Sequence, residues 1–349
     1  MARNPQEDPK PARARRRAGR ATMSDVARLA GVSAITVSRL LRDPASVSGT
    51  LAVRIRDAIE RLGYVPNLMA GGLAAAKSRI VGVVVPSIRN AFFAASVDAL
   101  SARFGERGYA VLDSSSDYDL RREDTLIEAM LAWNPAALVL TGFAHGPRAA
   151  AIVARAGVPI VEMWDVAGRP FDMAVGFDHN AAGRSVARHL LARGRRRVAV
   201  IGAMLGKDTR ASARCAGVRE ELERAGRPAV ATIDLPRASN VGDGASAFAE
   251  ALAAPGGIDA AAFSNDVLAL GAIFECQKRG VRIPDDVAIV GFGDLDFAAH
   301  CRPSLTTLRP PREQIGNETA RLLLSRIDGQ TPERPVVDLG CDLVVRESA

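Results

Sequence analysis

The pattern of hydrophobic and polar positions along the chain changes near residue 79. Beyond it, short runs rich in β-branched residues alternate with longer stretches of helical periodicity, such as 180–193 and 267–278. This alternation is typical of parallel sheets that carry helices on both faces. The expected strands are 80–85, 110–112, 137–140, 159–161, 173–177, 198–201, 229–233, 260–263 and 287–291.

These strands are too many for one compact sheet. We therefore predict an α/β fold with two doubly wound parallel-sheet lobes. Open sheets of this kind bind ligands beyond the carboxyl ends of their strands. The expected ligand site of this region is the cleft between the two lobes.

Residues 22–64 show a different pattern, which predicts three short amphipathic helices. The first helix begins with the capping-box pattern Thr22 to Asp25, and Gly31 ends it. Ser33 can cap a second helix that runs through Leu41. The first helix is expected to place on one face the apolar residues Val26, Leu29 and Ala30.

Pro44 breaks the chain after the second helix. Ser48 can cap a third helix, which Gly63 ends. Its apolar stripe consists of Leu51, Ile55, Ala58, Ile59 and Leu62.

The first two helices and the turn at Gly31 have the pattern of a helix-turn-helix. Small residues at Ala27 and Gly31 permit a close crossing, in which the first helix packs on Val37 and Leu40. An outward Ile35 would suit a thymine methyl group, because the exposure of a large apolar side chain to water is unfavourable. The second helix is expected to present outward Ala34, Ile35, Ser38 and Arg39.

The net charge of +7 is concentrated at the N-terminus. Residues 1–77 hold 14 Lys and Arg against 6 Asp and Glu, a net charge of +8, and the other 272 residues hold 32 against 33, a net charge of −1. This basic head favours DNA binding over the alternative, a three-helix bundle with no DNA role. Residues 1–21 are expected to be a disordered basic tail. Contact with DNA and simple solvation explain its positive charge equally well.

Several other classes of protein do not fit the composition. No apolar run is long enough for a membrane span, and the polar N-terminus does not resemble a secretory signal. The four cysteines lie far apart, which favours a reducing cytoplasm over a disulfide scaffold. The four histidines have no metal-ligand spacing, so we expect no metal. The expected location is the cytoplasm, in association with the nucleoid.

Enzyme motifs are incomplete. The loop 202–209 has three residues between its glycines, where a phosphate-binding loop needs four, and an aspartate follows its lysine. The segment 291–296 starts like a dinucleotide-binding motif but lacks the third glycine. The paired carboxylates at 285–286 follow a proline in a turn, where a solvated turn is the simpler interpretation. We expect neither catalysis nor a cofactor.

A resemblance to known proteins starts in the head, where the segment VARLAGVSAITVSRLLRDPASVSGTLAVRIRDAIERLGYVPN looks like the head of the lactose/galactose repressor family of bacterial transcription regulators. It continues through IVGVVVPSIRNAFFAA, VGFDHNAAGRSVARHLLARGRRRVAVIG, FSNDVLALGAI, IPDDVAIVGFGD and LTTLRPPREQIGNETARLLLSRIDG. The pieces MLAWNPAALVLT, VPIVEMWD and FDMAVGFD resemble the gluconate-operon repressor branch of that family.

The resemblance implies a homodimer that binds a palindromic operator, with one recognition helix from each subunit in the major groove. It also implies a core like that of periplasmic sugar-binding proteins, whose chain crosses three times between its lobes. A stand-alone sugar-binding protein is the rival interpretation of residues 78–349, which the attached head opposes. The expected parts are a head at 22–66, a hinge at 67–78, a first lobe at about 79–177 and 308–337, and a second lobe at about 178–305 and 338–349.

The chain departs from the family pattern at positions that would meet DNA. Many members carry a polar pair where this chain has Ala34 and Ile35, and Thr-Arg where it has Leu51 and Ala52. In the hinge, the residues at 71 and 72 are glycines, which cost up to about 1 kcal/mol each in helix stability. We assign the DNA contacts to Thr22, Ser33, Ala34, Ile35, Thr36, Ser38, Arg39, Asn67, Ala70 and Leu73, the last as a wedge in the minor groove.

The resemblance also implies an effector, a small carbohydrate that releases the protein from DNA. Arg214 matches an arginine that grips hydroxyls or carboxylates, and Asn265 belongs to the family's Asn-Asp pair. Many sugar-binding members have an aspartate where this chain has Gly293. The alternative is that Asp294 or Asp296 takes over the role of that aspartate in this chain. A pocket without this carboxylate repels an anionic ligand less, so it favours a sugar acid such as gluconate or its phosphate over a neutral sugar. The candidate cleft residues are Ser87, Arg89, Asn90, Phe93, Ser115, Arg214, Asn265 and Gly293.

Overall fold

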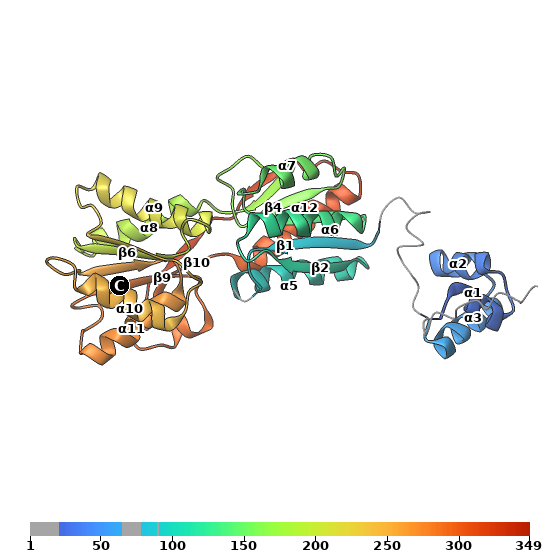
Figure 1. The fold of residues 1–349 in the computed structure, drawn as a ribbon, viewed down its shortest axis with the longest axis horizontal. Coiled ribbons are helices and arrows are strands. Elements are labelled where there is room, and N and C mark those ends of the chain that lie inside the picture. The colour runs from blue at the N-terminus through green and yellow to red at the C-terminus, as the bar shows by residue number, and fades with distance from the viewer. Residues whose placement is uncertain (1–20, 65–77, 89–90) are drawn as a thin grey trace, which may run out of the picture. The chain divides into compact units, whose positions relative to one another are not determined.

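The structure is a computed structural model that describes residues 21–64, 78–88 and 91–349. The chain divides into two compact units, Met1–Ala76 and Lys77–Ala349, which we call the head and the core. Figure 1 shows the helices of the head and the two sheets of the core.

The head contains the three expected helices: α1 (Met23–Ala30), α2 (Ala34–Arg42) and α3 (Gly49–Leu62), with a short 3₁₀ turn at Pro44–Ser46. The capping box is formed as predicted, because the Thr22 hydroxyl accepts from the Asp25 amide while Asp25 accepts from the Thr22 amide. Gly31 and Gly63 end α1 and α3 in the left-handed conformation that glycine tolerates best.

The core of the head lies between these helices. Val26, Ala27 and Ala30 pack with Val37 and Leu40, as predicted, and the third helix adds its own buried residues to this cluster. Those residues are Ala52, Ile55 and Ala58.

Two details of the predicted head are wrong. Leu29 is half exposed, because it lies roughly 100° around the helix from the centre of the buried face of α1. Ser48 occupies the residue before α3, but its side chain makes no capping hydrogen bond. The start of α3 therefore depends on packing and not on a serine cap.

The first lobe of the core is a six-stranded parallel sheet in the order β11-β5-β4-β3-β1-β2. Its strands are β1 (Ile80–Val85), β2 (Ala110–Ser115), β3 (Ala137–Thr141), β4 (Ile160–Met163), β5 (Met173–Gly176) and β11 (Val336–Asp338). Helices cover both faces, with α5 packed on α12 and α6 on α7 (Figure 1). These helices are α5 (Ala91–Glu106), α6 (Leu120–Ala132), α7 (Pro147–Val153) and α12 (Arg312–Ile327).

The second lobe is also a six-stranded sheet, in the order β12-β10-β9-β8-β6-β7, and only the pair of β10 and β12 is antiparallel. Its strands are β6 (Val198–Ala203), β7 (Ala231–Leu235), β8 (Ala260–Phe263), β9 (Ala288–Phe292), β10 (Thr306–Arg309) and β12 (Asp342–Val344). The covering helices pair as α8 with α9 and α10 with α11. They are α8 (His179–Ala192), α9 (Thr209–Arg224), α10 (Val241–Leu252) and α11 (Asp266–Arg279).

The chain passes between the sheets after β5, after β10 and between β11 and β12. All nine strands expected from the hydrophobic pattern coincide with or overlap an observed strand, which confirms the α/β class. Leu308 and Arg309 belong to β10 of the second sheet, although the predicted boundary placed them in the first lobe. The crossing comes later than expected because β10 pairs with β9 through Leu308 before the chain leaves the sheet.

Candidate functional site

The exposed face of α2 is the candidate DNA surface of the head. The Ile35 side chain is 72% exposed, and Arg39 is exposed as well, as the helical pattern predicted. Within the parts of the chain that the structure describes, Arg39 has no hydrogen bond or ion pair. An apolar side chain and an unpaired cation thus stand one turn apart on one helix, a combination that suits base edges in a major groove.

Among the other predicted DNA contacts of the head, Thr22 and Ser33 are exposed and Thr36 is half-buried. Ala34 packs partly against the core of the head, and Ser38 is half-buried. The Ser33 and Thr36 hydroxyls lie 2.9 Å apart, and Ser33 also accepts from the Thr36 amide. The Thr22 hydroxyl donates to Asp25 over 2.6 Å. These hydroxyls therefore have local partners at the starts of α1 and α2.

Five of the predicted site residues lie outside the described residues. They are the hinge residues Asn67, Ala70 and Leu73, and the cleft candidates Arg89 and Asn90.

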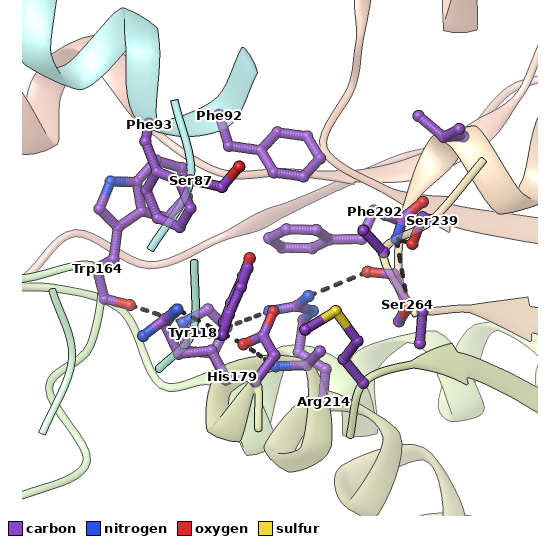
Figure 2. Close-up of a pocket in the computed structure, with 18 of the residues that line it drawn as sticks. Ser87, Phe92, Phe93, Tyr118, Trp164, His179, Arg214, Ser239, Ser264 and Phe292 are labelled. Atoms are coloured by element: carbon purple, nitrogen blue, oxygen red, sulfur yellow. Dashed lines mark hydrogen bonds and ion pairs between the residues drawn. The ribbon is translucent and has the colours of Figure 1, made fainter. Parts of the chain in front are cut away.

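A cavity of about 600 Å³ lies between the two lobes, at the carboxyl ends of both sheets. Figure 2 shows its walls, which combine aromatic rings with polar side chains. The residues that line it are Ser87, Phe92, Phe93, Tyr118 and Trp164 from the first lobe, and His179, Ala203, Met204, Asp208, Arg210, Ala211, Arg214, Ala238, Ser239, Asn240, Ser264, Asn265, Val267, Phe292 and Leu295 from the second.

Arg214 is a buried cation in the wall of this cavity, on α9. Its Nη1 lies 2.9 Å from His179 Nδ1, and its Nη2 donates to the Ser264 carbonyl over 3.0 Å. The guanidinium carbon lies 3.6 Å from the centre of the Phe292 ring, a cation–π contact (Figure 2). Burial lowers the pKa of Arg214 from its usual value, yet an arginine remains charged at neutral pH.

The charge of Arg214 has no carboxylate partner among the described residues, since every contact named above is to a neutral group. Its Nε is buried without a hydrogen bond. The Asp208 carboxylate acts on Arg214 only through space and forms its ion pair with Arg210. A buried cation whose hydrogen bonds go only to neutral groups favours an anionic ligand at this place.

Arg210 is a second buried cation of the same cavity, one helical turn before Arg214. It forms an ion pair with Asp208 over 3.6 Å and donates to the Thr141 carbonyl of the first lobe over 3.3 Å. It also lies over the Phe93 ring at 5.7 Å. Arg210 therefore differs from Arg214 because a carboxylate of its own helix start balances its charge.

Aromatic rings form the apolar wall. Phe92 meets Phe292 edge to face with centroids 5.5 Å apart, and Phe93 meets Trp164 in the same way at 5.3 Å. Rings of this kind stack well on the C–H face of a sugar. Asn265 completes the polar wall, where its amide donates to the Ser239 hydroxyl over 2.7 Å.

Four of the predicted cleft residues line the cavity: Ser87, Phe93, Arg214 and Asn265. Ser115 does not, because its hydroxyl donates to the Pro86 carbonyl over 3.3 Å. Gly293 does not line it either. A Cβ atom at Gly293 would lie 2.0 Å from Cε1 of Phe92, so the Phe92 ring fills the space of a side chain at that position.

The carboxylates next to Gly293 do not replace the missing aspartate in the cavity wall. Asp294 forms ion pairs with Arg309 and Arg346, at 2.5 and 2.6 Å. Asp266 is buried, accepts from Thr307 and from the Leu295 amide, and has a pKa raised by burial to about 6. Neither these two nor Asp296 lines the cavity.

The cavity lining also includes residues that were not predicted from the sequence, among them His179, Arg210, Trp164, Phe292 and Phe92. A usable signal existed for three of them, because Trp164, His179 and Phe292 lie at or just beyond the carboxyl ends of β4, β5 and β9. Ligands of open α/β sheets bind at such ends. Arg210 and Phe92 had no comparable signal, since their place in the cavity depends on how the lobes meet.

Of the helices that the structure describes, none combines the length and the apolarity that a membrane crossing requires. Within the same residues, no group of three or more His, Cys, Asp or Glu side chains is placed to hold a metal ion.

Comparisons with known proteins agree with both units. Residues 22–67 match the lacI family of bacterial regulatory proteins, and residues 187–349 match a periplasmic binding protein-like domain. The chain is 42% identical to the HTH-type transcriptional regulator GntR of Pseudomonas aeruginosa, over 95% of this chain and 97% of that protein. It is 36% identical to the GntR regulator of Escherichia coli K12, over 93% and 97%.

Solved structures give the same result. A lacI-family regulator from Silicibacter pomeroyi is 29% identical, with a TM-score of 0.90 over 94% of this chain and 99% of that one. The regulator GntR from Chromobacterium violaceum is 36% identical, with a TM-score of 0.73 over 77% and 98%. The lac repressor dimer bound to its operator and an anti-inducer is 25% identical, with a TM-score of 0.79 over 95% and 99%. This chain is a DNA-binding transcriptional regulator that belongs to the lacI family of bacterial regulatory proteins.

Proposed function

We propose that the protein binds a palindromic operator as a homodimer and acts as a repressor. The exposed Ile35 and Arg39 of α2 support this, because they suit a thymine methyl group and a guanine edge. The likeness to a lac repressor dimer on its operator supports it as well. In a two-fold symmetric dimer, the two recognition helices meet two half-sites, so the operator repeats the symmetry of the protein.

Selection of bound sequences from random DNA tests the operator. We expect a palindrome, and a chain that lacks residues 1–77 should lose binding while its core stays folded and dimeric, because Lys77–Ala349 is a compact unit. Equal affinity of the full and the shortened chain for the selected DNA contradicts the assignment to the head.

We further propose that the effector is a sugar acid, such as gluconate or its phosphate, bound in the cavity between the lobes. The single observation that carries this is the charge of Arg214, which lies buried in the cavity wall with neutral partners only, within the described residues. An arginine fork binds a carboxylate or a phosphate through two parallel hydrogen bonds. The aromatic rings and the amides of the cavity wall would contact the hydroxyl-bearing carbon chain of the sugar acid.

A neutral sugar is the second candidate, because aromatic rings such as Phe93 and amides such as Asn265 line the cavity. It would leave the Arg214 guanidinium without a carboxylate or phosphate in direct contact. The sugar acid is therefore favoured by the electrostatics of the site.

Calorimetry of the full chain with gluconate, 6-phosphogluconate, glucose and ribose separates the two candidates. We expect the acids to bind more tightly, and Arg214→Ala to weaken them strongly. The matched control is Arg219→Ala on the same helix, an exposed arginine away from the cavity wall, which should leave the affinity unchanged. Tighter binding of the neutral sugars, or an unchanged gluconate affinity in Arg214→Ala, overturns the assignment.

Effector binding would then act on DNA through the lobes. A ligand that contacts both lobes favours the closed cleft. Closure changes the orientation of one lobe relative to the other, and this alters the DNA-binding surface of the dimer. Linkage requires that the operator weakens effector binding by the same factor by which the effector weakens operator binding.

A further inference from the structure

His179 is a buried histidine at the first position of α8, and it has a partner on each side of its ring. Its Nδ1 lies 2.9 Å from Nη1 of Arg214, and its Nε2 lies 2.6 Å from the Trp164 carbonyl oxygen (Figure 2). An arginine can only donate and a carbonyl can only accept. The ring is therefore neutral and carries its proton on Nε2.

The surroundings of His179 hold it in this neutral form. Burial lowers its pKa well below the usual value, and the positive charges of Arg214 and Arg210 lower it further. The first turn of α8 adds a positive helix end, which also disfavours a cation. Protonation of the ring would place two positive charges in contact and remove the acceptor that Arg214 uses.

Close packing of α8 on α9 brings the two side chains together. A Cβ atom at Gly183 of α8 would lie 2.0 Å from the Arg214 carbonyl oxygen. A Cβ atom at Gly217 of α9 would lie 2.1 Å from the Asn180 carbonyl oxygen. Only glycine at these two places allows the helix backbones to approach so closely, and this approach sets the distance between His179 and Arg214.

The two hydrogen bonds of His179 join residues of different lobes. Arg214 belongs to α9 of the second lobe, whereas Trp164 directly follows β4 of the first lobe. Trp164 itself packs edge to face on Phe93, another residue of the cavity wall. A continuous path of contacts therefore runs from the unbalanced guanidinium, through the imidazole ring, to the backbone of the other lobe.

We propose that His179 is a positioning residue, which holds the Arg214 guanidinium in place for an anionic ligand and ties it to the first lobe through the Trp164 carbonyl. The ligand class rests on the proposed function, but the pairing of His179 with Arg214 does not. One N–H of each Arg214 Nη atom is taken up by His179 and Ser264. The second N–H of each Nη atom remains for a carboxylate, whereas Nε is buried.

Substitution of His179 tests the positioning role in the full chain. His179→Phe keeps a ring but removes the acceptor, and we expect it to lower gluconate affinity about 10- to 100-fold, as for a lost hydrogen bond to a charged group. His179→Gln can still accept and donate, so it should recover much of that loss. The control is His189→Gln, a half-buried histidine in the last turn of the same helix, which should leave gluconate affinity unchanged. Gluconate affinity of a folded His179→Phe within twofold of the wild type overturns the proposal.

Nuclear magnetic resonance of ¹⁵N-labelled histidines tests the pairing without any ligand. The chain has four histidines, so single substitutions assign their signals. We expect His179 to be neutral at neutral pH, with the proton on Nε2, and Arg214→Met to raise its pKa because a neighbouring positive charge is removed. A protonated His179 at neutral pH, a proton on Nδ1, or no response to Arg214→Met overturns the pairing.

The two measurements separate the proposals. If the wild type binds no sugar acid while His179 responds to Arg214→Met as expected, the effector class is wrong and the pairing stands. If the wild type binds gluconate and His179→Phe binds it equally well, the effector class stands and the positioning role is wrong.

Discussion

The ring of Phe92 occupies the space that a side chain at Gly293 would need, with Cε1 only 2.0 Å from the position of a Cβ atom there. Gly293 also has a φ of +129°, which a residue with a side chain rarely adopts. The glycine thus leaves room for the Phe92 ring, which lines the cavity.

This relationship predicts the effect of Gly293→Ala. The new methyl group must displace Phe92 and accept an unfavourable φ, so we expect a loss of about 1–3 kcal/mol in the free energy of unfolding. Gly206→Ala is the matched control, because no atom lies within 4 Å of its Cβ position. Urea unfolding of both variants measures the difference. An equal, small effect of the two substitutions contradicts the packing described here.

The two serine or threonine caps of the head should differ in their contribution to stability. Thr22→Ala removes the hydroxyl that accepts from the Asp25 amide, although the backbone N–H of residue 22 can still donate to Asp25, and it should cost about 1 kcal/mol. Ser48→Ala should cost little, because the Ser48 side chain makes no capping hydrogen bond at the start of α3. Hydrogen exchange of the head amides in the full chain reports both effects, and faster exchange in Ser48→Ala than in Thr22→Ala would contradict the observed caps.

Arg39 should contribute to operator binding. Arg39→Ala is expected to weaken binding to the selected palindrome by about 1–3 kcal/mol if the guanidinium reads a base edge. Arg61→Ala is the control, since Arg61 is an exposed arginine of α3 in an ion pair with Asp57. Fluorescence anisotropy with specific and random DNA distinguishes base reading from phosphate contact, which would weaken both DNAs equally.

His145 of the first lobe gives the stability a predictable dependence on pH. It lies buried between Glu123 and Glu162, with ring nitrogens 3.1 and 3.3 Å from their carboxylates. Burial alone would lower its pKa, but the hydrogen bonds and charges of the two glutamates raise the pKa to about 9. A raised pKa means that His145 stabilises the fold fully below its unfolded value near 6.5, and that this contribution is lost as the pH rises through about 9.

Urea unfolding between pH 6 and pH 9 measures this contribution, which we expect to be about 3 kcal/mol. Both tryptophans, Trp133 and Trp164, belong to the first lobe, so their fluorescence reports on the lobe that contains His145. His145→Gln should be less stable at pH 7 and should lose most of the pH dependence. His300→Gln is the control, because His300 is exposed. An unchanged pH dependence in His145→Gln would show that the cluster does not stabilise the protein in this way.

The strands and head helices were predictable because each is visible in a short stretch of sequence. Runs such as Ile80–Val85 are buried on both faces of a parallel sheet and consist of apolar residues throughout. The strands β10, β11 and β12 were not in the list from the hydrophobic pattern. Strand β10 has the sequence TTLR, with one apolar residue, and β11 and β12 have three residues each with exposed positions. A short run of this kind does not stand out from a loop.

The candidate site was predictable only in part. Arg214 and Asn265 stand in segments that resemble the family, and both line the cavity. Arg210 and Phe92 depend on contacts that join distant parts of the chain, namely Arg210 with Thr141 and Phe92 with Gly293. No periodicity or motif within a single segment encodes such contacts. Ser115 does not line the cavity, because its hydroxyl contacts the Pro86 carbonyl of a neighbouring strand end and the Asp117 carboxylate, at 3.3 Å each.

The central claim is that an acid bound at Arg214 releases the protein from DNA. The most direct test measures the affinity of the full chain for its selected operator as gluconate is added, in the wild type and in Arg214→Ala. We predict that gluconate weakens operator binding about 5- to 150-fold, the usual range of such coupling, and that the operator weakens gluconate binding by the same factor. Arg214→Ala should keep its operator affinity and lose the response. An operator affinity that saturating gluconate and its 6-phosphate leave unchanged, while glucose or ribose lowers it, would contradict the account.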